Sequence, residues 1–147
     1  MKGLIQRVTS ASVIVEGKTV ATITTGLLLL LGVERTDTEK HAVKLCKKVL
    51  NYRVFPDEHG RMNLSLMDIG GALLVVPQFT LATDTRSGTR PGFSLAAPPA
   101  EANVIFRHFL GLASAAIGQG RVSAGQFGAD MKVSLINDGP VTFMLES

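Results

Sequence analysis

The sequence predicts an α/β fold: a mainly antiparallel curved sheet or open barrel with two helices packed against it. Three patterns support this class. Apolar and polar residues alternate near the start of the chain, other stretches are apolar on both faces, and two segments repeat apolar residues at helical spacing. The 147 residues are expected to form one domain over residues 1–147, since domains commonly contain roughly 100–150 residues. With 46% hydrophobic and 18% charged residues, the composition excludes intrinsic disorder.

The first third of the chain is expected to form strands. Apolar residues alternate with polar ones over residues 5–15, and the turn-forming residues 16–18 predict a hairpin that returns through residues 19–24. Residues 26–33 are apolar on both faces, which is typical of a central strand. The leucine run at 27–31 is far shorter than the about 20 residues that a membrane-spanning helix needs, so no membrane association is expected.

Two segments predict helices. Thr36, with Glu39 three residues later, forms a capping-box pattern, and residues 42–50 then place apolar side chains on one helical face. The second helix is expected over residues 98–118, because two prolines are tolerated in its first turn and its apolar residues recur at helical spacing.

Between these helices the sequence predicts a hairpin, a strand and a long loop. The turn residues 57–60 separate two short strand-like segments, 54–55 and 62–66. Residues 72–76 form another strand that is apolar on both faces. Residues 77–97 lack a regular period, and a loop of that length inside a compact domain is usually functional.

Charge and cysteine content limit the partners and the compartment. The formal net charge is +3 and the isoelectric point is about 9.3, which permits a nucleic-acid partner without requiring one. The single cysteine, Cys46, excludes an intrachain disulfide and fits a reducing compartment. Because no signal-like segment is visible at the start of the sequence, we expect a cytoplasmic protein.

Several kinds of site find little support. None of the three histidines has a His or Cys partner at zinc-site spacing, so neither a metal nor another cofactor is expected. No Gly-x-Ser-x-Gly motif marks a serine hydrolase, although a triad of His108, Asp84 and one of several serines stays possible. Gly118 and Gly120 lack the third glycine of a dinucleotide-binding loop.

Two polar segments have a functional interpretation beside a structural one. Residues 77–81 read Pro-Gln-Phe-Thr-Leu, where a buried strand meets the long loop; they can line a pocket or simply end the strand. Residues 137–140 read Asn-Asp-Gly-Pro between two predicted final strands, about 131–136 and 141–145. On physical grounds alone, a tight hairpin turn is the better interpretation of that segment.

Four short segments gain significance when they are taken together. They read Leu-Ile-Gln-Arg-Val-Thr at 4–9, Gln-Phe-Thr-Leu at 78–81, Arg-Pro-Gly-Phe-Ser at 90–94 and Asn-Asp-Gly-Pro-Val-Thr at 137–142. In this order and at these positions they resemble the D-aminoacyl-tRNA deacylases. The resemblance runs from residue 1 to the last predicted strand without a large gap.

The resemblance implies a homodimeric editing enzyme, a carboxylic ester hydrolase that cleaves the ester between a D-amino acid and tRNA. In this family the Gly-Pro peptide bond is cis, and the dipeptide enters the active site of the other subunit. Gly139 and Pro140 are therefore assigned to chiral selection, and Arg7 resembles the arginine that steadies their loop. The family also accepts the glycyl ester, which clears glycine mischarged onto alanine tRNA.

The resemblance also assigns the remaining site residues. Gln78, Phe79 and Thr80 correspond to the catalytic pocket that holds the aminoacyl group, and Pro91 and Phe93 to substrate binding. No cofactor is implied, and the expected partners are tRNA and a second copy of the chain, with no DNA and no membrane.

One position departs from the family pattern, which usually has serine before Gln-Phe-Thr. Pro77 offers neither a hydroxyl nor an N–H, so no catalytic task can depend on donation there. We therefore expect backbone N–H groups near Phe79 and Thr80 to stabilise the oxyanion, with water attacking and the 2′-hydroxyl of the terminal adenosine assisting. Thr80 is either a nucleophile or, as we favour, a group that orients substrate or water.

Two rival functions and the RNA contacts stay open from the sequence alone. A hydrolase of free D-amino acid esters or peptides would not need the tRNA body. A non-catalytic RNA-binding module is supported only by the basic isoelectric point, because one tyrosine and no tryptophan offer little for base stacking. For tRNA phosphates the candidate contacts are basic side chains spread over the loop and first helix: Arg86, Arg90, Lys44, Lys47 and Lys48.

Overall fold

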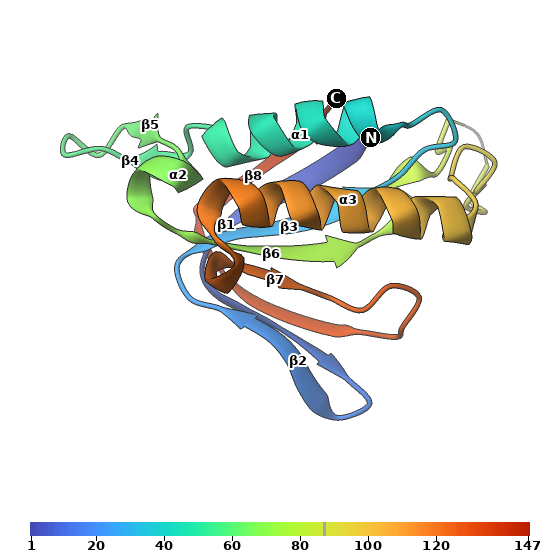
Figure 1. Ribbon diagram of the computed structural model, residues 1–147, viewed down its shortest axis with the longest axis horizontal. Coiled ribbons are helices and arrows are strands. Elements are labelled where there is room, and N and C mark those ends of the chain that lie inside the picture. Colours follow the sequence, from blue (N-terminus) through green and yellow to red (C-terminus); the bar gives the residue numbers. More distant parts are fainter. Residues whose placement is uncertain (87) are drawn as a thin grey trace.

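A curved sheet of six strands forms the centre of the molecule (Figure 1). The computed structural model describes residues 1–86 and 88–147. The strand order is β2-β1-β3-β6-β7, and β8 pairs with β1. These strands are β1 Lys2–Val15, β2 Lys18–Ile23, β3 Gly26–Gly32, β6 Ala72–Pro77, β7 Val122–Ala124 and β8 Lys132–Glu146.

The sheet is mainly antiparallel, as the sequence predicts. β1 runs antiparallel to β2, β3 and β8, whereas β6 runs parallel to both β3 and β7. The remaining elements are α1 Glu39–Asn51, β4 Phe55–Pro56, β5 Met62–Leu64, α2 Leu66–Ile69, η1 Phe79–Ala82, α3 Pro99–Ile117 and η2 Gln119–Arg121. The α/β class is confirmed, and both long helices lie where the sequence places them.

The helix prediction needs two corrections. A third, one-turn helix, α2, follows β5, because the Ser65 hydroxyl accepts a hydrogen bond from the backbone N–H of Asp68 at 3.2 Å and caps its start. The first helix is capped by Thr38 rather than Thr36, since the Thr38 backbone N–H donates to Nδ1 of His41 at 3.0 Å. A histidine takes the place that glutamate has in the usual capping box.

The last part of the chain differs from the predicted pair of strands. β8 is one strand of 15 residues, and both of its halves pair with β1. Asn137 lies opposite Val8 and Thr142 opposite Gln6, so four residues of β8 bulge out opposite Arg7 alone. The turn-forming residues 137–140 therefore make a bulge inside a strand and not a hairpin turn.

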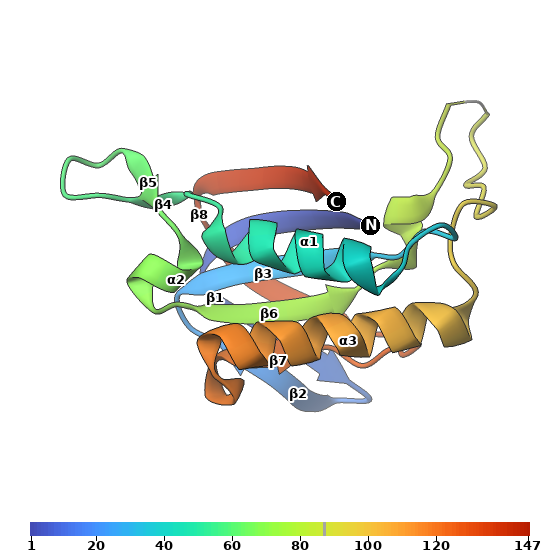
Figure 2. The same ribbon diagram turned by 45° about the horizontal axis from the view of Figure 1, so that its top comes forward.

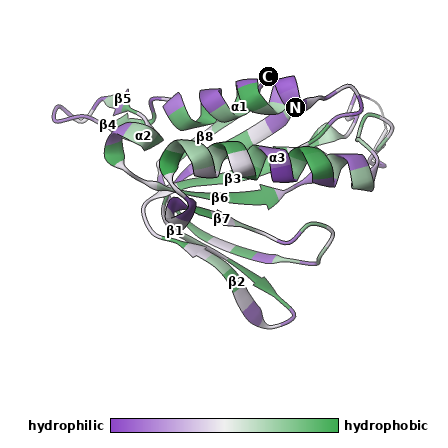
Figure 3. Ribbon diagram, viewed as in Figure 1, coloured by the Kyte–Doolittle hydropathy of each residue, from purple (hydrophilic) through white to green (hydrophobic). Residues whose placement is uncertain are grey.

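Two hydrophobic cores hold the sheet. The larger lies between the sheet and helices α1 and α3, and it includes Leu29, Leu45 and Phe109. The smaller fills the concave side of the sheet around Val13, Leu28 and Leu74. Figure 2 shows α1 and α3 side by side over the same face of the sheet, and Figure 3 shows that β6 is hydrophobic along its length.

The opposite face of β1 and β8 is not covered by a helix. On this face Leu4 pairs with Met144, which is 48% exposed; on the other side of the bulge Ser10 pairs with Ile136, which is 62% exposed. None of the described helices is both long enough and apolar enough to cross a membrane.

Candidate active site

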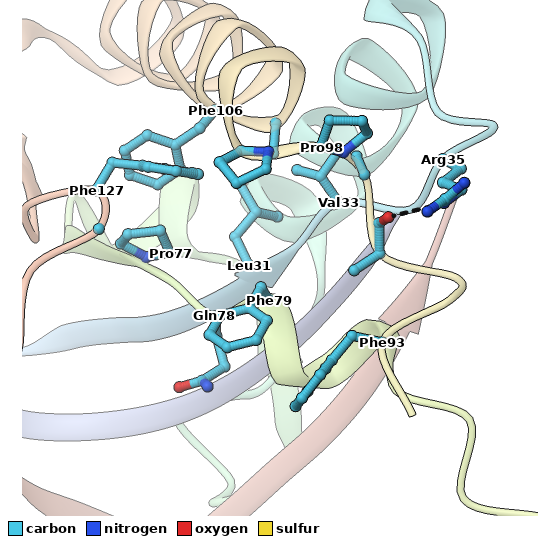
Figure 4. Close-up of a pocket in the computed structure, with 15 residues that line it drawn as sticks. Leu31, Val33, Arg35, Pro77, Gln78, Phe79, Phe93, Pro98, Phe106 and Phe127 are labelled. Atoms are coloured by element: carbon cyan, nitrogen blue, oxygen red, sulfur yellow. Dashed lines mark hydrogen bonds between the residues drawn. The ribbon is translucent and has the colours of Figure 1, made fainter. Parts of the chain in front are cut away.

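A pocket of about 520 Å³ opens where β3 and β6 end beside the start of α3 (Figure 4). Its walls are almost entirely apolar, and four of its residues are phenylalanines. The main contributors are Leu31 and Val33 after β3, Gln78 and Phe79 after β6, Phe93 from the long loop, and Phe106 and Phe127 from α3 and the loop before β8. The shape and lining suit a small organic group.

Residues Gln78 and Phe79 reach the pocket because η1 begins where β6 stops. The Gln78 N–H donates to the Leu31 carbonyl at 2.8 Å, which anchors the turn to β3. Gly32 permits this close packing, because a Cβ there would lie 2.9 Å from Cβ of Leu81. The Phe79 ring is 58% exposed and packs against Phe93, with ring centroids 5.1 Å apart.

The first two backbone N–H groups of η1, those of Phe79 and Thr80, have no hydrogen-bond acceptor within the described part of the chain. Such groups at the start of a helical turn have no partner inside the turn. The Gln78 side-chain amide donates to Oγ1 of Thr80, and this amide cannot act as a base. The turn therefore offers donors for an oxygen that gains negative charge, and it provides no base for the Thr80 hydroxyl.

Pro77 is the last residue of β6, as its chemistry predicts. It lies opposite Leu31 of β3, while β7 pairs with β6 only as far as Val75. A proline is tolerated there because the pairing on one side has already ended.

Arg7 and Gly139 lie together at a different place on the sheet. The Arg7 guanidinium donates to the Asp138 carbonyl at 3.0 Å and to the Val54 carbonyl at 2.6 Å. It also forms an ion pair with the Asp138 carboxylate at 3.2 Å. Arg7 thus ties the bulge of β8 to the segment before β4.

The bulge presents Gly139 and Pro140 to solvent, and the peptide bond between them is cis. Gly139 has φ +133°, a region that side chains disfavour, and a Cβ on it would lie 2.7 Å from Cγ2 of Val141. The Val141 N–H donates to Oδ1 of Asn137 at 3.1 Å, which closes the bulge across its base.

These two groups of predicted site residues are not adjacent within one chain. Arg7 lies opposite Leu27 of β3, whereas Pro77 lies opposite Leu31, four residues further along the same strand. At about 3.3 Å per residue, the two groups are separated by roughly 13 Å along the sheet. The structure brings Gln78, Phe79 and Phe93 together, and separately Arg7 with Gly139 and Pro140.

The structure shows the surroundings of two predicted residues in the loop between η1 and α3. Pro91 is exposed and does not line the pocket, unlike Phe93. Arg86 donates to both carboxylate oxygens of Asp84, at 2.9 and 2.6 Å, and this hydrogen bonding lowers the pKa of Asp84. A carboxylate therefore already balances the charge of Arg86.

The family model for D-Tyr-tRNA(Tyr) deacylase matches residues 4–146. The chain belongs to this family. A D-aminoacyl-tRNA deacylase of Marinobacter nauticus is 69% identical over 147 residues, covering 100% of this chain and 94% of the relative. The Pseudomonas aeruginosa protein of the same name is 57% identical, with full coverage of both chains. As a member of the deacylase family, the chain is a hydrolase.

Solved structures agree with the fold. The structure of a protein named c-Myc DNA Unwinding Element Binding Protein superposes with a TM-score of 0.96 at 41% identity, covering 100% of this chain and 99% of that one. A probable eukaryotic D-amino acid tRNA deacylase superposes with a TM-score of 0.85 at 17% identity, covering 99% and 98%. The second similarity supports the fold alone.

Phe106, Phe127 and Arg35 are among the pocket residues that sequence reasoning missed. Phe106 has the helical spacing of a core residue, and it is indeed 3% exposed while also forming the pocket wall. Phe127 lies in a glycine-containing loop, where an isolated aromatic residue was the available signal. Arg35 follows a strand in a charged stretch, and nothing local distinguishes it from a solvated side chain.

Cys46 lies apart from the pocket. Cys46 is buried in α1, and burial raises the pKa of its thiol to about 11, so it stays protonated and unreactive near neutral pH. No cluster of three metal-binding side chains occurs among residues 1–86 and 88–147.

Proposed function

We propose that this protein hydrolyses the ester bond of D-aminoacyl-tRNA, releasing the free D-amino acid and tRNA. The observation that carries the proposal is the turn at Phe79 and Thr80, whose two backbone N–H groups have no acceptor in the described chain and whose Phe79 lines an aromatic pocket. Membership of the deacylase family supplies the substrate class.

The proposed reaction needs little from side chains, because an aminoacyl ester is already activated. The backbone N–H groups of Phe79 and Thr80 stabilise the oxyanion that forms when the carbonyl is attacked. Water is the nucleophile, assisted by the free 2′-hydroxyl of the terminal adenosine. Thr80 orients substrate or water, a role supported by its hydroxyl accepting from Gln78 and by the absence of a base bonded to it in the described structure.

The active species in this proposal is a homodimer. The pocket and the Gly139–Pro140 bulge lie roughly 13 Å apart along β3 in one chain, so neither can complete the other. The uncovered face of β1 and β8 around Leu4 and Met144, the latter 48% exposed, lies between them. A two-fold axis through that face exchanges its ends, and each bulge then meets the pocket of the other chain.

In the dimer, Gly139 and Pro140 select chirality by exclusion. Every L-residue directs its Cβ to the same place, and backbone atoms placed there reject all of them without recognising any side chain. A D-residue points its Cβ away, and a glycyl ester has no Cβ to exclude. The proposal therefore includes cleavage of glycyl-tRNA, and it accounts for an editor that accepts many D-amino acids.

Contacts to the tRNA backbone are proposed to come from exposed cations rather than from base readout. Arg90, Lys44 and Lys47 are exposed and form no ion pair with any described residue, whereas Arg86 is paired with Asp84. Lys48 donates to the Glu146 carbonyl at 3.0 Å. This hydrogen bond leaves Lys48 charged but restricts the movement of its side chain. We expect a salt dependence with a log–log slope of roughly −0.7 per phosphate contact.

A second function, binding to a DNA element, is suggested by the name of the solved protein that is 41% identical to this chain. The deacylase proposal is better supported, because the relatives named as deacylases are 57% and 69% identical. One assay set separates the two functions. Purified protein is incubated with D-, L- and glycyl-tRNA, and its binding to duplex DNA is measured at the same salt concentration.

We expect fast release from D-aminoacyl- and glycyl-tRNA and little from L-aminoacyl-tRNA. Equal cleavage of free D-amino acid esters would favour a general esterase. Absence of any deacylation, combined with tight DNA binding, would replace the proposed function with the second one.

A further inference from the structure

Arg35 is the one charged side chain among the described residues that line the pocket. It lies just after β3, and Figure 4 shows it beyond Val33, at the end of the pocket away from Phe106 and Phe127. The rest of the lining is apolar apart from Gln78. A guanidinium at the rim of such a pocket is suited to an anion that stays outside while an uncharged group enters.

The Arg35 segment is held firmly. The Arg35 N–H donates to the Leu95 carbonyl at 3.0 Å, and the Ala97 N–H donates to the Val33 carbonyl at 3.1 Å. The Nε of Arg35 also donates to the Ala96 carbonyl at 3.3 Å (Figure 4). These bonds fix the base of the guanidinium, while its two terminal nitrogens have no acceptor among the residues described.

The nearby carboxylates do not neutralise Arg35. Glu34 forms ion pairs with Lys2 at 3.4 Å and with the amino group of Met1 at 3.5 Å. Asp37 binds the same amino group at 2.5 Å. No carboxylate of the described chain lies within 4.0 Å of the Arg35 guanidinium.

We infer that Arg35 binds a backbone phosphate of the single-stranded 3′ end of the tRNA. This inference rests on the proposed function, which places the ester at the neighbouring turn of Phe79 and Thr80. The terminal nucleoside is joined to the rest of the tRNA by phosphodiesters, which must pass the rim of the pocket. The planar, two-pronged donor set of arginine matches phosphate oxygens, and here both outer nitrogens are available.

The test compares Arg35→Gln with Arg61→Gln in steady-state deacylation of D-aminoacyl-tRNA at several salt concentrations. Arg61 is a matched control, because its side chain is 73% exposed in the β4–β5 hairpin at the far end of the molecule (Figure 1). We expect Arg35→Gln to raise KM about tenfold with little change in kcat, and to reduce the salt slope by about 0.7. Arg35→Lys should restore part of the affinity, since it keeps the charge but loses the fork.

A D-aminoacyl ester of adenosine, which has no phosphate, provides the second arm. Unchanged kcat/KM on this substrate, together with the loss on tRNA, would support the inference. An equal loss on both substrates, or an unaltered salt slope, would overturn it and assign Arg35 to the structure of the loop. If the wild-type protein itself fails on D-aminoacyl-tRNA, the proposed function fails instead, so the two failures are distinct.

Discussion

The two halves of the proposed site lie level with opposite ends of strand β3, and they are built in opposite ways. At the Leu31 end the turn of Phe79 and Thr80 leaves its donors unpaired and opens onto a pocket. At the Leu27 end the Arg7 guanidinium holds the bulge of β8 through carbonyl and carboxylate contacts. One half is built to receive a group, and the other is built to hold a fixed shape.

The difference shows where the backbone geometry must be precise. Stabilising an oxyanion requires donors that are already in place, and the backbone of a short turn supplies them. In the proposed mechanism, excluding a Cβ requires a rigid wall, and contacts from Arg7 hold the bulge in place. Changes at the bulge should therefore damage selectivity and turnover together, whereas changes of single side chains at the turn should be milder.

The largest effect is expected from Gly139→Ala. The new Cβ would lie 2.7 Å from Val141 Cγ2 in a backbone with φ +133°, so the wall must shift. A displacement of this size should lower kcat/KM for D-aminoacyl-tRNA about 100-fold. Gly111→Ala is the matched control, because nothing lies within 4 Å of a Cβ there. If Gly139→Ala had wild-type kinetics, the bulge would not be part of the active site.

Combining two variants, each damaged in one half of the site, tests whether the halves come from different chains. Phe79→Ala damages the pocket and Gly139→Ala the bulge, so a mixed dimer has one intact site and one doubly damaged site. Each purified mixed dimer keeps one intact site of two, which predicts recovery to about half of wild-type activity. Co-expression with two affinity tags provides the sample. No recovery in purified mixed dimers would mean that both halves act within one chain.

A smaller loss is expected from Arg7→Gln. The change leaves the Val54 and Asp138 carbonyls without their donor, which should cost about 1–3 kcal/mol of the free energy of unfolding. Turnover should fall roughly tenfold, because the bulge keeps its backbone pairing with β1 on both sides. Thermal denaturation and kinetics are measured beside Arg61→Gln. Equal behaviour of the two variants would show that Arg7 does not brace the bulge.

Thr80→Val should reduce kcat by about tenfold without abolishing activity, because the hydroxyl orients the reactants and the oxyanion donors belong to the backbone. Thr80→Ser should recover most of this loss. Mass spectrometry of a quenched reaction should reveal no threonyl ester. Complete inactivity of Thr80→Val, with an acylated wild-type protein, would instead make Thr80 the nucleophile.

The smallest effect concerns the acid stability of the loop contact beside the pocket. Hydrogen bonds from Arg86 lower the pKa of Asp84 in the folded protein, so the pair stabilises the fold above the ordinary pKa of aspartate and loses this contribution as pH falls through the lowered value. Carboxyl carbon chemical shifts should place the Asp84 midpoint below about 3.9. In Arg86→Gln the midpoint should rise toward that value, and an unchanged midpoint would contradict the pairing.

The sequence predicted the sheet and both long helices well, because their signals are local periodicities. The errors of the sequence-based prediction came from residues that can form more than one kind of local structure. Asn137, Asp138, Gly139 and Pro140 are turn formers, and they do change the chain direction, but pairing with β1 resumes on the far side. Only the long-range partner decides between a turn and a bulge.

The site residues were proposed from motifs, which carry no information on their geometry. The motifs at 78–80 and 139–140 gave no indication that they lie level with opposite ends of β3, because strand pairing sets that separation. Arg35 was missed for a similar reason. No carboxylate of the described residues pairs with Arg35, because Glu34 pairs with Lys2 and the Met1 amino group and Asp37 pairs with the Met1 amino group. No local sequence pattern reveals these pairings.

The position of the bulge inside β8 limits how its length can evolve. Surface loops usually tolerate insertions and deletions, because the elements on either side keep their places. Here β8 pairs with β1 on both sides of the bulge. Deleting or adding one residue would slide one half of β8, and its buried and exposed side chains would exchange faces. We therefore expect random indel libraries to tolerate length changes in the β1–β2 turn, at Glu16–Gly17, and to reject them between Asn137 and Thr142.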